Sequence, residues 1–225
     1  MGPTAIARDY CDEEGPRPRA GSADASAAPR WRVAVAYGWL SSQLRFGDVG
    51  APFHQRSVAA SATLRLDDRW TLQAGAGAVI GGGLDAGGVS YSMDPGWLAR
   101  VGASWLAVEG RGWWPFVAVS ASLAASGVQT TGPGGVKAPL TSIDAGLSVS
   151  VGKAFFGAVA PYVGAKVFGG PVFWTLGGTS TTGTDVDHWQ VAFGVLASLP
   201  LGIDLTAEWA PFGARSALAQ VGWAF

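Results

Sequence analysis

Apolar and polar residues alternate with a period of two over ten successive runs of the chain, from Trp31 to the C-terminus. In the first run one face carries Trp31, Val33, Val35, Tyr37 and Trp39, and the other carries Arg32, Ala34, Ala36 and Gly38. Residues two apart project from the same side of an extended strand, so these runs predict half-buried β-strands. Each run spans about 9–13 residues, whereas strands of soluble proteins usually have about 5–6. The length favours strands that cross a bilayer at a tilt.

The charged residues within these runs all fall on the polar face. They are Arg32, Arg65, Arg100, Asp144, Lys166, Asp204 and Glu208. A lipid-facing Arg or Lys near the middle of a membrane costs about 2–4 kcal/mol, which a lumen-facing one avoids. A soluble β-sandwich also keeps charges off its apolar face, so this feature alone does not choose between the two. In a barrel, we expect these side chains and Tyr162 to form a polar network in the lumen.

Tryptophans gather near the ends of the runs. We expect Trp31, Trp70, Trp113 and Trp223 to mark one rim of the barrel, and Trp39, Trp97, Trp189 and Trp209 to mark the other. Tryptophan favours the membrane interface, where its ring is apolar and its N–H can meet water. Two rings of tryptophan therefore predict the aromatic girdles of a membrane barrel.

The connections between the runs alternate in length. Tight turns are expected at 67–69, 109–112, 153–157 and 200–202, and longer Gly/Thr-rich loops at 45–55, 81–96, 126–139 and 170–187, with a short last connection at 211–215. Short turns at one end and long loops at the other are typical of outer-membrane barrels, whose turns face the periplasm. The sequence therefore predicts an all-β fold: an antiparallel up-and-down transmembrane β-barrel of about ten strands, with both chain ends on the turn side.

Composition agrees with this interpretation. The chain has 225 residues, of which 14% are charged, and its net charge is −1. Without a basic patch, no nucleic-acid partner is expected, and no run of about 18 apolar residues predicts a spanning helix. Residues 1–30 are rich in Pro, Ala and charge and lack periodicity, which predicts a disordered leader or periplasmic linker with a free Cys11 and without a secretory signal. Residues 31–225 form the predicted barrel.

The C-terminal segment Ala219–Phe225 resembles the last strand of bacterial outer-membrane proteins, which ends on an aromatic residue behind alternating apolar residues. The resemblance implies that the barrel-assembly machinery is a partner and reads Val221, Trp223 and Phe225. It also implies an integral protein in outer-membrane lipid, with the leader and the C-terminus in the periplasm. Two internal segments, 161–165 and 204–209, are similar to strands of OmpA-like and porin-like barrels.

Candidate chemistry is sparse. The chain has two histidines, and His188 lies beside Asp185 and Asp187 in the fourth expected loop. A histidine between carboxylates is one element of acid–base catalysis, but a catalytic site needs more converging groups. We expect no catalytic residue, no metal and no cofactor. The predicted function is a non-enzymatic integral outer-membrane barrel, structural or porin-like with a narrow channel, whose loops could bind an unidentified partner.

Two alternatives stay open. One is an outer-membrane enzyme that hydrolyses lipid or peptide with His188, and the other is a soluble ligand-binding β-barrel. For the lumen we favour a polar plug over an open passage, because barrels of about eight strands are usually filled by side chains. Asp144 and Lys166 lie on consecutive strands at what the sequence places as a similar depth. We therefore predict an interior salt bridge between them.

Overall fold

The structure, a computed structural model, describes residues 30–110 and 112–225. The predicted leader, with Cys11, lies outside the described residues except for Arg30. Thirteen antiparallel strands form one sheet: β1 (Trp31–Phe46), β2 (Val49–Arg65), β3 (Trp70–Ala86), β4 (Val89–Met93), β5 (Gly96–Val108), β6 (Phe116–Thr131), β7 (Lys137–Gly152), β8 (Val159–Gly169), β9 (Pro171–Leu176), β10 (Thr179–Asp185), β11 (Trp189–Ser198), β12 (Ile203–Gly213) and β13 (Arg215–Ala224). Two 3-10 turns complete the described chain: η2 (Pro133–Gly135) and η3 (Pro200–Gly202). No helix of the described residues is long and apolar enough to cross a membrane.

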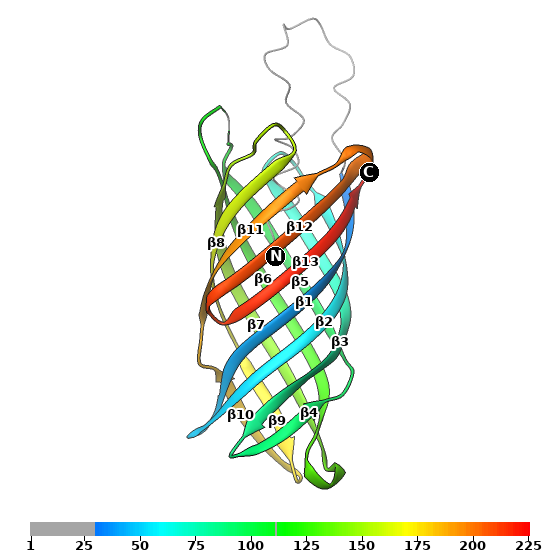
Figure 1. The fold of residues 1–225 in the computed structure, drawn as a ribbon, viewed down its shortest axis with the longest axis vertical. Coiled ribbons are helices and arrows are strands. Elements are labelled where there is room, and N and C mark those ends of the chain that lie inside the picture. Colours follow the sequence, from blue (N-terminus) through cyan, green and yellow to red (C-terminus); the bar gives the residue numbers. More distant parts are fainter. Residues whose placement is uncertain (1–29, 111) are drawn as a thin grey trace, which may run out of the picture.

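The sheet closes into a tilted barrel (Figure 1). Three pairs of strands, β4 with β5, β8 with β9 and β10 with β11, each follow one path that is interrupted by one to three residues. The main body is therefore a ring of ten: β1, β2, β3, β5, β6, β7, β8, β11, β12 and β13, with β13 pairing back onto β1 over ten residue pairs. The predicted fold class is confirmed.

Beyond the short β12–β13 hairpin the barrel narrows. There β10 pairs directly with β1, where Leu44, Arg45 and Phe46 face Asp185, Thr184 and Gly183. A second closed ring follows, made of the eight strands β1, β2, β3, β4, β6, β7, β9 and β10. We call this eight-stranded part the collar. In Figure 1 it occupies the lower end, and the four tight turns lie at the upper end, which we call the turn end.

The four long loops expected from the sequence are largely replaced by paired strands. The loop expected at 126–139 shortens to residues 132–136, which include η2, and the other three become two-residue turns. Gly47 and Asp48 alone connect β1 to β2, Gly87 and Gly88 connect β3 to β4, and Gly177 and Gly178 connect β9 to β10. All five of these glycines have positive φ values, between 58° and 85°, a backbone region that glycine enters without steric cost. The prediction of loops was wrong because a two-residue glycine turn lets strands continue where Gly- and Thr-rich sequence was taken for coil.

The polarity of the wall reverses between the main body and the collar. In the main body, outward side chains such as Val35, Leu72 and Val163 are apolar and exposed. In the collar, outward positions such as Arg45, His54 and Asp85 are polar or charged, whereas inward ones are apolar and buried. An apolar outer face suits lipid, and an apolar interior with a polar surface suits water. The reversal places the membrane around the ten-stranded body and the collar in the aqueous phase.

Candidate functional site

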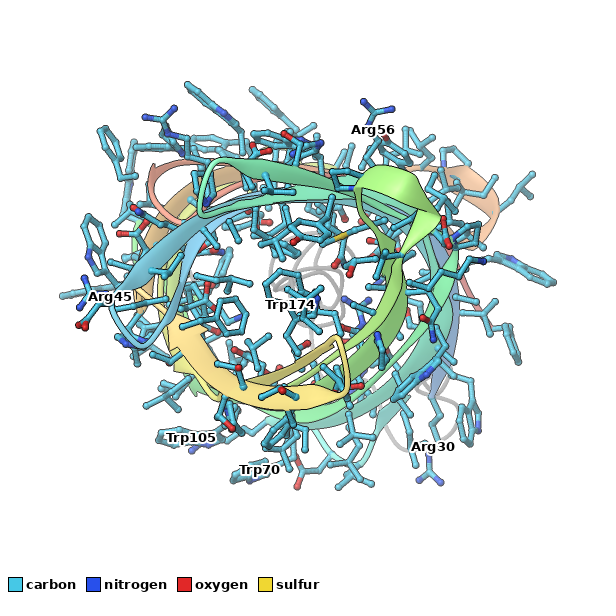
Figure 2. All side chains as sticks on the ribbon, turned by 90° about the horizontal axis from the view of Figure 1, so that it is seen from below. Arg30, Arg45, Arg56, Trp70, Trp105 and Trp174 are labelled. Carbon is cyan, nitrogen blue, oxygen red and sulfur yellow. The ribbon has the colours of Figure 1, made fainter. Side chains whose placement is uncertain are left out.

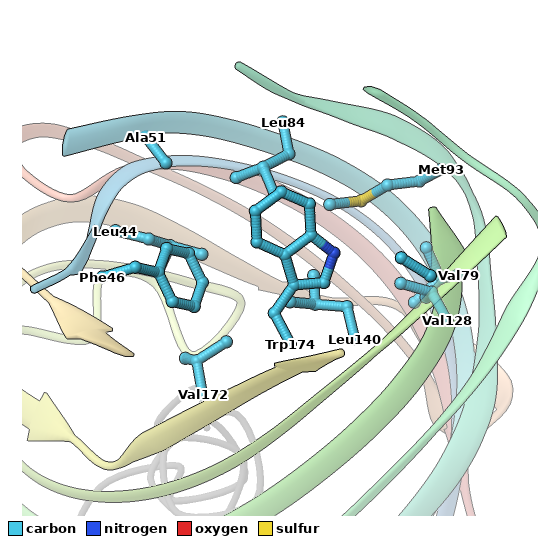
Figure 3. Packing of buried hydrophobic residues seen from close by; sticks show 11 residues of the cluster. Leu44, Phe46, Ala51, Val79, Leu84, Met93, Val128, Leu140, Val172 and Trp174 are labelled. Carbon is cyan, nitrogen blue, oxygen red and sulfur yellow. The ribbon is translucent and has the colours of Figure 1, made fainter. Parts of the chain in front are cut away.

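The lumen of the collar is filled by an apolar cluster centred on Trp174 of β9. Its buried members are Leu44, Phe46, Ala51, Val79, Leu84, Met93, Val128, Ala138, Leu140, Val172 and Trp174 (Figure 3). Seen along the barrel axis from the collar, Trp174 lies near the middle of the opening (Figure 2). A barrel of eight strands is just wide enough for side chains to fill. The collar therefore closes this end of the lumen.

Trp174 is fixed by contacts from several strands. Its ring centroid lies 5.4 Å from that of Phe46 and 4.9 Å from that of Tyr91, the latter in an edge-on arrangement. Its indole Nε1 donates to Oγ1 of Thr130 at 3.0 Å, and that hydroxyl donates to the carbonyl oxygen of Ala138 at 2.8 Å. Thr130 has no exposed surface, so this chain of hydrogen bonds satisfies the polar atoms within the apolar cluster.

The turn end of the lumen holds a second, mixed layer. Nε of Arg32 lies 3.0 Å from Oδ2 of Asp204, and both side chains are buried. Tyr162 donates a hydrogen bond of 2.7 Å to Glu208. An apolar cluster from β5, β6, β8 and β11 also fills this end of the lumen. Its buried members are Leu106, Phe116, Ala118, Ala160, Tyr162 and Leu196. The lumen is thus occupied near both ends.

Inward glycines make room for the long polar side chains. A Cβ built on each would come closer to the neighbouring side chain than ordinary van der Waals contact allows: 3.3 Å from Arg100 at Gly75, 2.7 Å from Lys166 at Gly146, 2.6 Å from Arg32 at Gly222, and closer still to Tyr162 at Gly194. These four contacts explain why the sequence places glycine so often on the inner face. A larger residue there would push the polar side chain out of its place.

Between the two layers lies a cavity of about 320 Å³, which we call the chamber. Its polar wall includes Arg100, Asp144, Lys166, Asp185 and Gln190. Its wall toward the collar is apolar and includes Leu44, Phe53, Leu98, Val128, Leu140 and Val172. The volume is at the lower end of the roughly 300–1,000 Å³ typical of small-molecule sites.

The eight residues expected in a lumen network separate into distinct groups. Arg32 with Asp204, and Tyr162 with Glu208, lie at the turn end. Arg100, Asp144 and Lys166 line the chamber. Arg65 lies at the rim, where its guanidinium binds Asp68 at 2.6 Å and the carbonyl oxygen of Asp67 at 3.2 Å. Arg65 thus braces the β2–β3 turn.

The expected salt bridge between Asp144 and Lys166 is absent among the described ion pairs. Lys166 faces Ser148 in the β7–β8 register, four positions along from Asp144. Its side chain lies over Gly146, and Nζ is 5.0 Å from the ring centroid of Phe168. Both residues line the chamber as the alternation predicts, but the stagger of the strands separates them. The prediction was right about the face and wrong about the contact.

His188 lies between strands, in line with the loop position expected from the sequence. It is in the break between β10 and β11, with its side chain exposed beside Gly169. Asp185 faces the chamber and accepts a hydrogen bond of 2.7 Å from Ser42 across the β1–β10 seam. The residues that the structure describes contain no group of three or more His, Cys, Asp or Glu that could hold a metal.

The tryptophans expected in the girdles are mostly exposed on the outer wall. Trp31, Trp70, Trp97, Trp189, Trp209 and Trp223 are 45–59% exposed, Trp113 is 97% exposed in the turn after β5, and Trp39 is partly buried. Trp223 donates from Nε1 to the carbonyl oxygen of Leu201 at 3.0 Å, which ties the turn-end girdle to η3. Three tryptophans were missed: Trp105, which stacks on Trp70 at 6.3 Å, Trp114, which is 73% exposed next to Trp113, and Trp174 in the collar.

The expected assembly residues line the closing seam of the barrel. Val221 and Trp223 face Val35 and Val33 across the β13–β1 pair. Phe225 exchanges two backbone hydrogen bonds with Trp31, of 3.0 and 3.3 Å. Its ring lies 5.4 Å from that of Trp223 and is 58% exposed. The C-terminal residues therefore complete the outer wall at the turn end.

No protein-family model matches the chain, and no curated protein matches it in sequence. Among solved structures, the translocator domain of the autotransporter NalP from Neisseria meningitidis is similar, with a TM-score of 0.52, 11% identity and coverage of 99% of this chain and 93% of that one. The outer membrane protease OmpT from Escherichia coli has a TM-score of 0.49 and 8% identity, covering 87% and 96% of the two chains.

The outer membrane protein OprG from Pseudomonas aeruginosa has a TM-score of 0.47 and 9% identity, covering 88% and 96%. These identities show a shared fold alone, and only the NalP likeness exceeds a TM-score of 0.5. A shared fold does not specify an activity. The closed antiparallel ring and the NalP likeness together give this chain the fold of a small bacterial outer-membrane β-barrel.

Proposed function

We propose that the chain is a non-enzymatic integral protein of the bacterial outer membrane that acts as a narrow porin-like channel with a closed resting state. The turn end faces the periplasm and the collar faces the outside. The observation that supports a channel is the chamber of about 320 Å³ between two occupied layers. A barrel with only a structural role gains stability from a filled lumen, because a void loses packing contacts. A polar chamber that side chains leave unfilled therefore favours a channel that solutes enter over a barrel with only a structural role.

The collar supplies a gate. The β10–β1 seam that closes it has three paired residues, together with the hydrogen bonds from Val186 N to Gln43 O and from Ser42 to Asp185. By comparison, β1 pairs with β13 over ten residues. The β9–β10 hairpin carries Trp174, is held to β1 by this seam and is held to β7 by three residue pairs, one of which joins Trp174 and Leu140. Separation of β10 from β1, followed by movement of the hairpin away from β7, would withdraw Trp174 and open the collar without breaking the ten-stranded ring.

The enzyme alternative has less support. The side chain of His188 is exposed, and the Ser42 hydroxyl is engaged by Asp185. At this place the described residues form no hydrogen bond between a nucleophile and the histidine, which hydrolysis by a nucleophile, a base and an orienting carboxylate would use, and this supports the non-enzymatic proposal.

A disulfide across the seam tests the gate. Arg45 and Thr184 are directly opposite and both point outward, at a separation that antiparallel partners share with disulfides. We expect intermittent conductance of the wild type in planar bilayers, loss of it in oxidised R45C/T184C made with Cys11→Ser, and recovery after reduction. The single R45C variant with Cys11→Ser is the control.

A second variant opens both ends. Trp174→Ala removes the centre of the collar cluster, and Phe116→Ala removes a fully packed residue of the turn-end cluster. We expect steady conductance from the double variant, once its folding has been checked by the heat-modifiable shift on gels. Silence of both the wild type and the folded double variant would mean that the barrel is structural.

A further inference from the structure

Arg100 is a cation of the chamber that the protein leaves without a partner. No hydrogen bond or ion pair joins it to another described side chain, and its Nε atom is buried without a hydrogen-bond partner. By contrast, Arg32, which lies in the lumen at the turn end, forms an ion pair with Asp204. Arg100 is half-buried, and a guanidinium that is partly withdrawn from water without a counter-charge is costly to maintain. It marks a position where an anionic group from outside the chain would be stabilised.

The surroundings of Arg100 are built to leave space at this position. On its own row around the wall, Arg100 faces Gly75 on β3 and Ala124 on β6, and Ala124 in turn faces Asp144 on β7. The guanidinium lies over Gly75, where an added Cβ would come within 3.3 Å of Nε. Small neighbours on both sides leave the guanidinium facing the chamber. Asp144 shares this row two strands away, with Ala124 between them, and no ion pair joins it to Arg100 among the described side chains.

Two other charged side chains of the chamber, Asp185 and Lys166, have contacts within the protein. The Asp185 carboxylate accepts the Ser42 hydrogen bond. Lys166 lies over Gly146 on β7, the strand that carries Asp144, and its Nζ faces the Phe168 ring at 5.0 Å. Arg100 has no comparable contact. The site for an anion is therefore at Arg100 and not at the acidic side of the chamber.

The chamber is also amphipathic. Leu44, Val128, Leu140 and Val172 belong both to its wall and to the collar cluster, and Leu98 adds to the apolar side. A ligand with its charge at Arg100 would extend its remaining atoms toward this apolar wall. Burial of that part would be favourable by about 25 cal/mol per Å² of apolar surface. The volume of about 320 Å³ restricts the ligand to a small molecule.

We propose that the chamber binds a small organic monocarboxylate, whose carboxylate pairs with the Arg100 guanidinium and whose apolar body contacts the wall beneath the collar. Carboxylate is the preferred partner because its two oxygens match the two parallel N–H donors of the guanidinium. This inference names a solute class for the proposed channel. Transport of that solute rests on the proposed channel function, whereas binding requires only the chamber.

Calorimetry on the full chain in detergent tests the binding with three probes of equal chain length: hexanoate, hexylammonium and 1-hexanol. We expect saturable binding of hexanoate, and affinities at least about tenfold lower for the alcohol and the amine, since charge-assisted hydrogen bonds contribute about 1.5–3 kcal/mol. Arg100→Gln should lose the hexanoate preference. Arg56→Gln removes an arginine on the outer wall (Figure 2) and should bind as the wild type does; it also controls for uptake by the micelle.

A second variant covers the case in which Arg100→Gln fails to fold. Ala124→Leu leaves every charge in place and fills space beside Arg100, so it should also abolish hexanoate binding. Equal binding of hexanoate and hexanol, tighter binding of hexylammonium, or hexanoate binding that survives Ala124→Leu would each overturn the proposal. A conducting barrel that fails to bind hexanoate would refute this inference and leave the channel, whereas binding by a silent barrel would refute the channel alone.

Discussion

Arg32 on β1 and Asp204 on β12 form an ion pair across the intervening strand β13, with 3.0 Å between Nε and Oδ2 and exposures of 6% and 0%. The pair spans the seam where the first and last strands close the barrel. Gly222 on β13 faces Asp204, two positions from Ala224, which faces Arg32. The missing side chain of Gly222 leaves space for the Arg32 guanidinium. The closure of the ring therefore includes a buried electrostatic contact in addition to its backbone ladder.

Removing one partner of this pair should cost more than removing both. Arg32→Met leaves a buried carboxylate without its counter-charge, which typically costs about 3–5 kcal/mol, whereas the double variant with Asp204→Leu should be less destabilised than that single variant. Urea unfolding in lipid vesicles measures the cycle. The matched control is the exposed Lys137–Asp94 pair, at 3.7 Å, for which a coupling below about 1 kcal/mol is expected. Additive effects at Arg32 and Asp204 would show that the pair has no energetic role.

The outer wall of β8 should reject a charge. Val163 faces outward and is 47% exposed, while its neighbour Gly164 faces the lumen. Val163→Arg places a cation against lipid at a cost of about 2–4 kcal/mol near mid-depth. Gly164→Ser should be tolerated, since a Cβ there would lie 3.4 Å from Ser150 Oγ, an ordinary contact. The heat-modifiable gel shift after refolding into lipid gives the two yields, and equal yields would contradict the assignment of faces.

Deletion of Phe225 should impair assembly in cells more than folding in vitro. The ring is 58% exposed, so its loss removes little packing, although the two backbone hydrogen bonds to Trp31 are lost as well. We expect reduced outer-membrane levels with nearly normal refolding in detergent. Phe212→Ala, which removes a 54% exposed aromatic ring away from the C-terminus, is the control for general loss of an aromatic. Wild-type membrane levels of the deletion would argue against recognition of the C-terminal strand.

The β2–β3 turn should confer a stability that depends on pH. Backbone hydrogen bonds from Arg69 N–H and Trp70 N–H, at 2.8 and 2.7 Å, lower the pKa of the Asp67 carboxyl from its ordinary 3.8. A lowered pKa in the folded state stabilises the fold above the ordinary pKa, and this stabilisation is lost as the pH falls through the lowered value. Asp67→Asn keeps an acceptor oxygen but does not titrate. The stability difference between wild type and variant should therefore shrink as the pH falls from about 5 through 3.8 to below the lowered pKa; a constant difference would rule out the titration of Asp67.

The main body could be predicted from sequence because lipid and lumen impose opposite demands on alternate residues. Val33 and Arg32, or Val163 and Tyr162, reveal their faces by chemistry alone. The collar could not be recognised by the same rule, because there the faces exchange roles: Leu44 and Phe46 point inward and Arg45 points outward. The alternation of buried Val172 and Trp174 with exposed Phe173 could have indicated strand β9, but the many Gly and Thr residues around it were interpreted as a loop.

Contacts inside the lumen depend on register, which alternation does not determine. Asp144 and Lys166 share the inner wall, but a shift of four positions in the β7–β8 pairing separates them. Conversely, the pairing of Arg32 with Asp204 and of Tyr162 with Glu208 crosses an intervening strand. Such partners become visible only when the curvature and stagger of the closed sheet are known.

The β10–β1 seam has a consequence for how the protein behaves among its neighbours. In the collar, beyond the short β12–β13 hairpin, β1 and β10 would each present a row of unpaired backbone N–H and C=O groups to water if they were not joined. Free strand edges of this kind accept strands from other chains and promote aggregation. By pairing with each other, β1 and β10 leave the collar with no open edge, so the part of the barrel that projects beyond the lipid is protected from adding foreign strands.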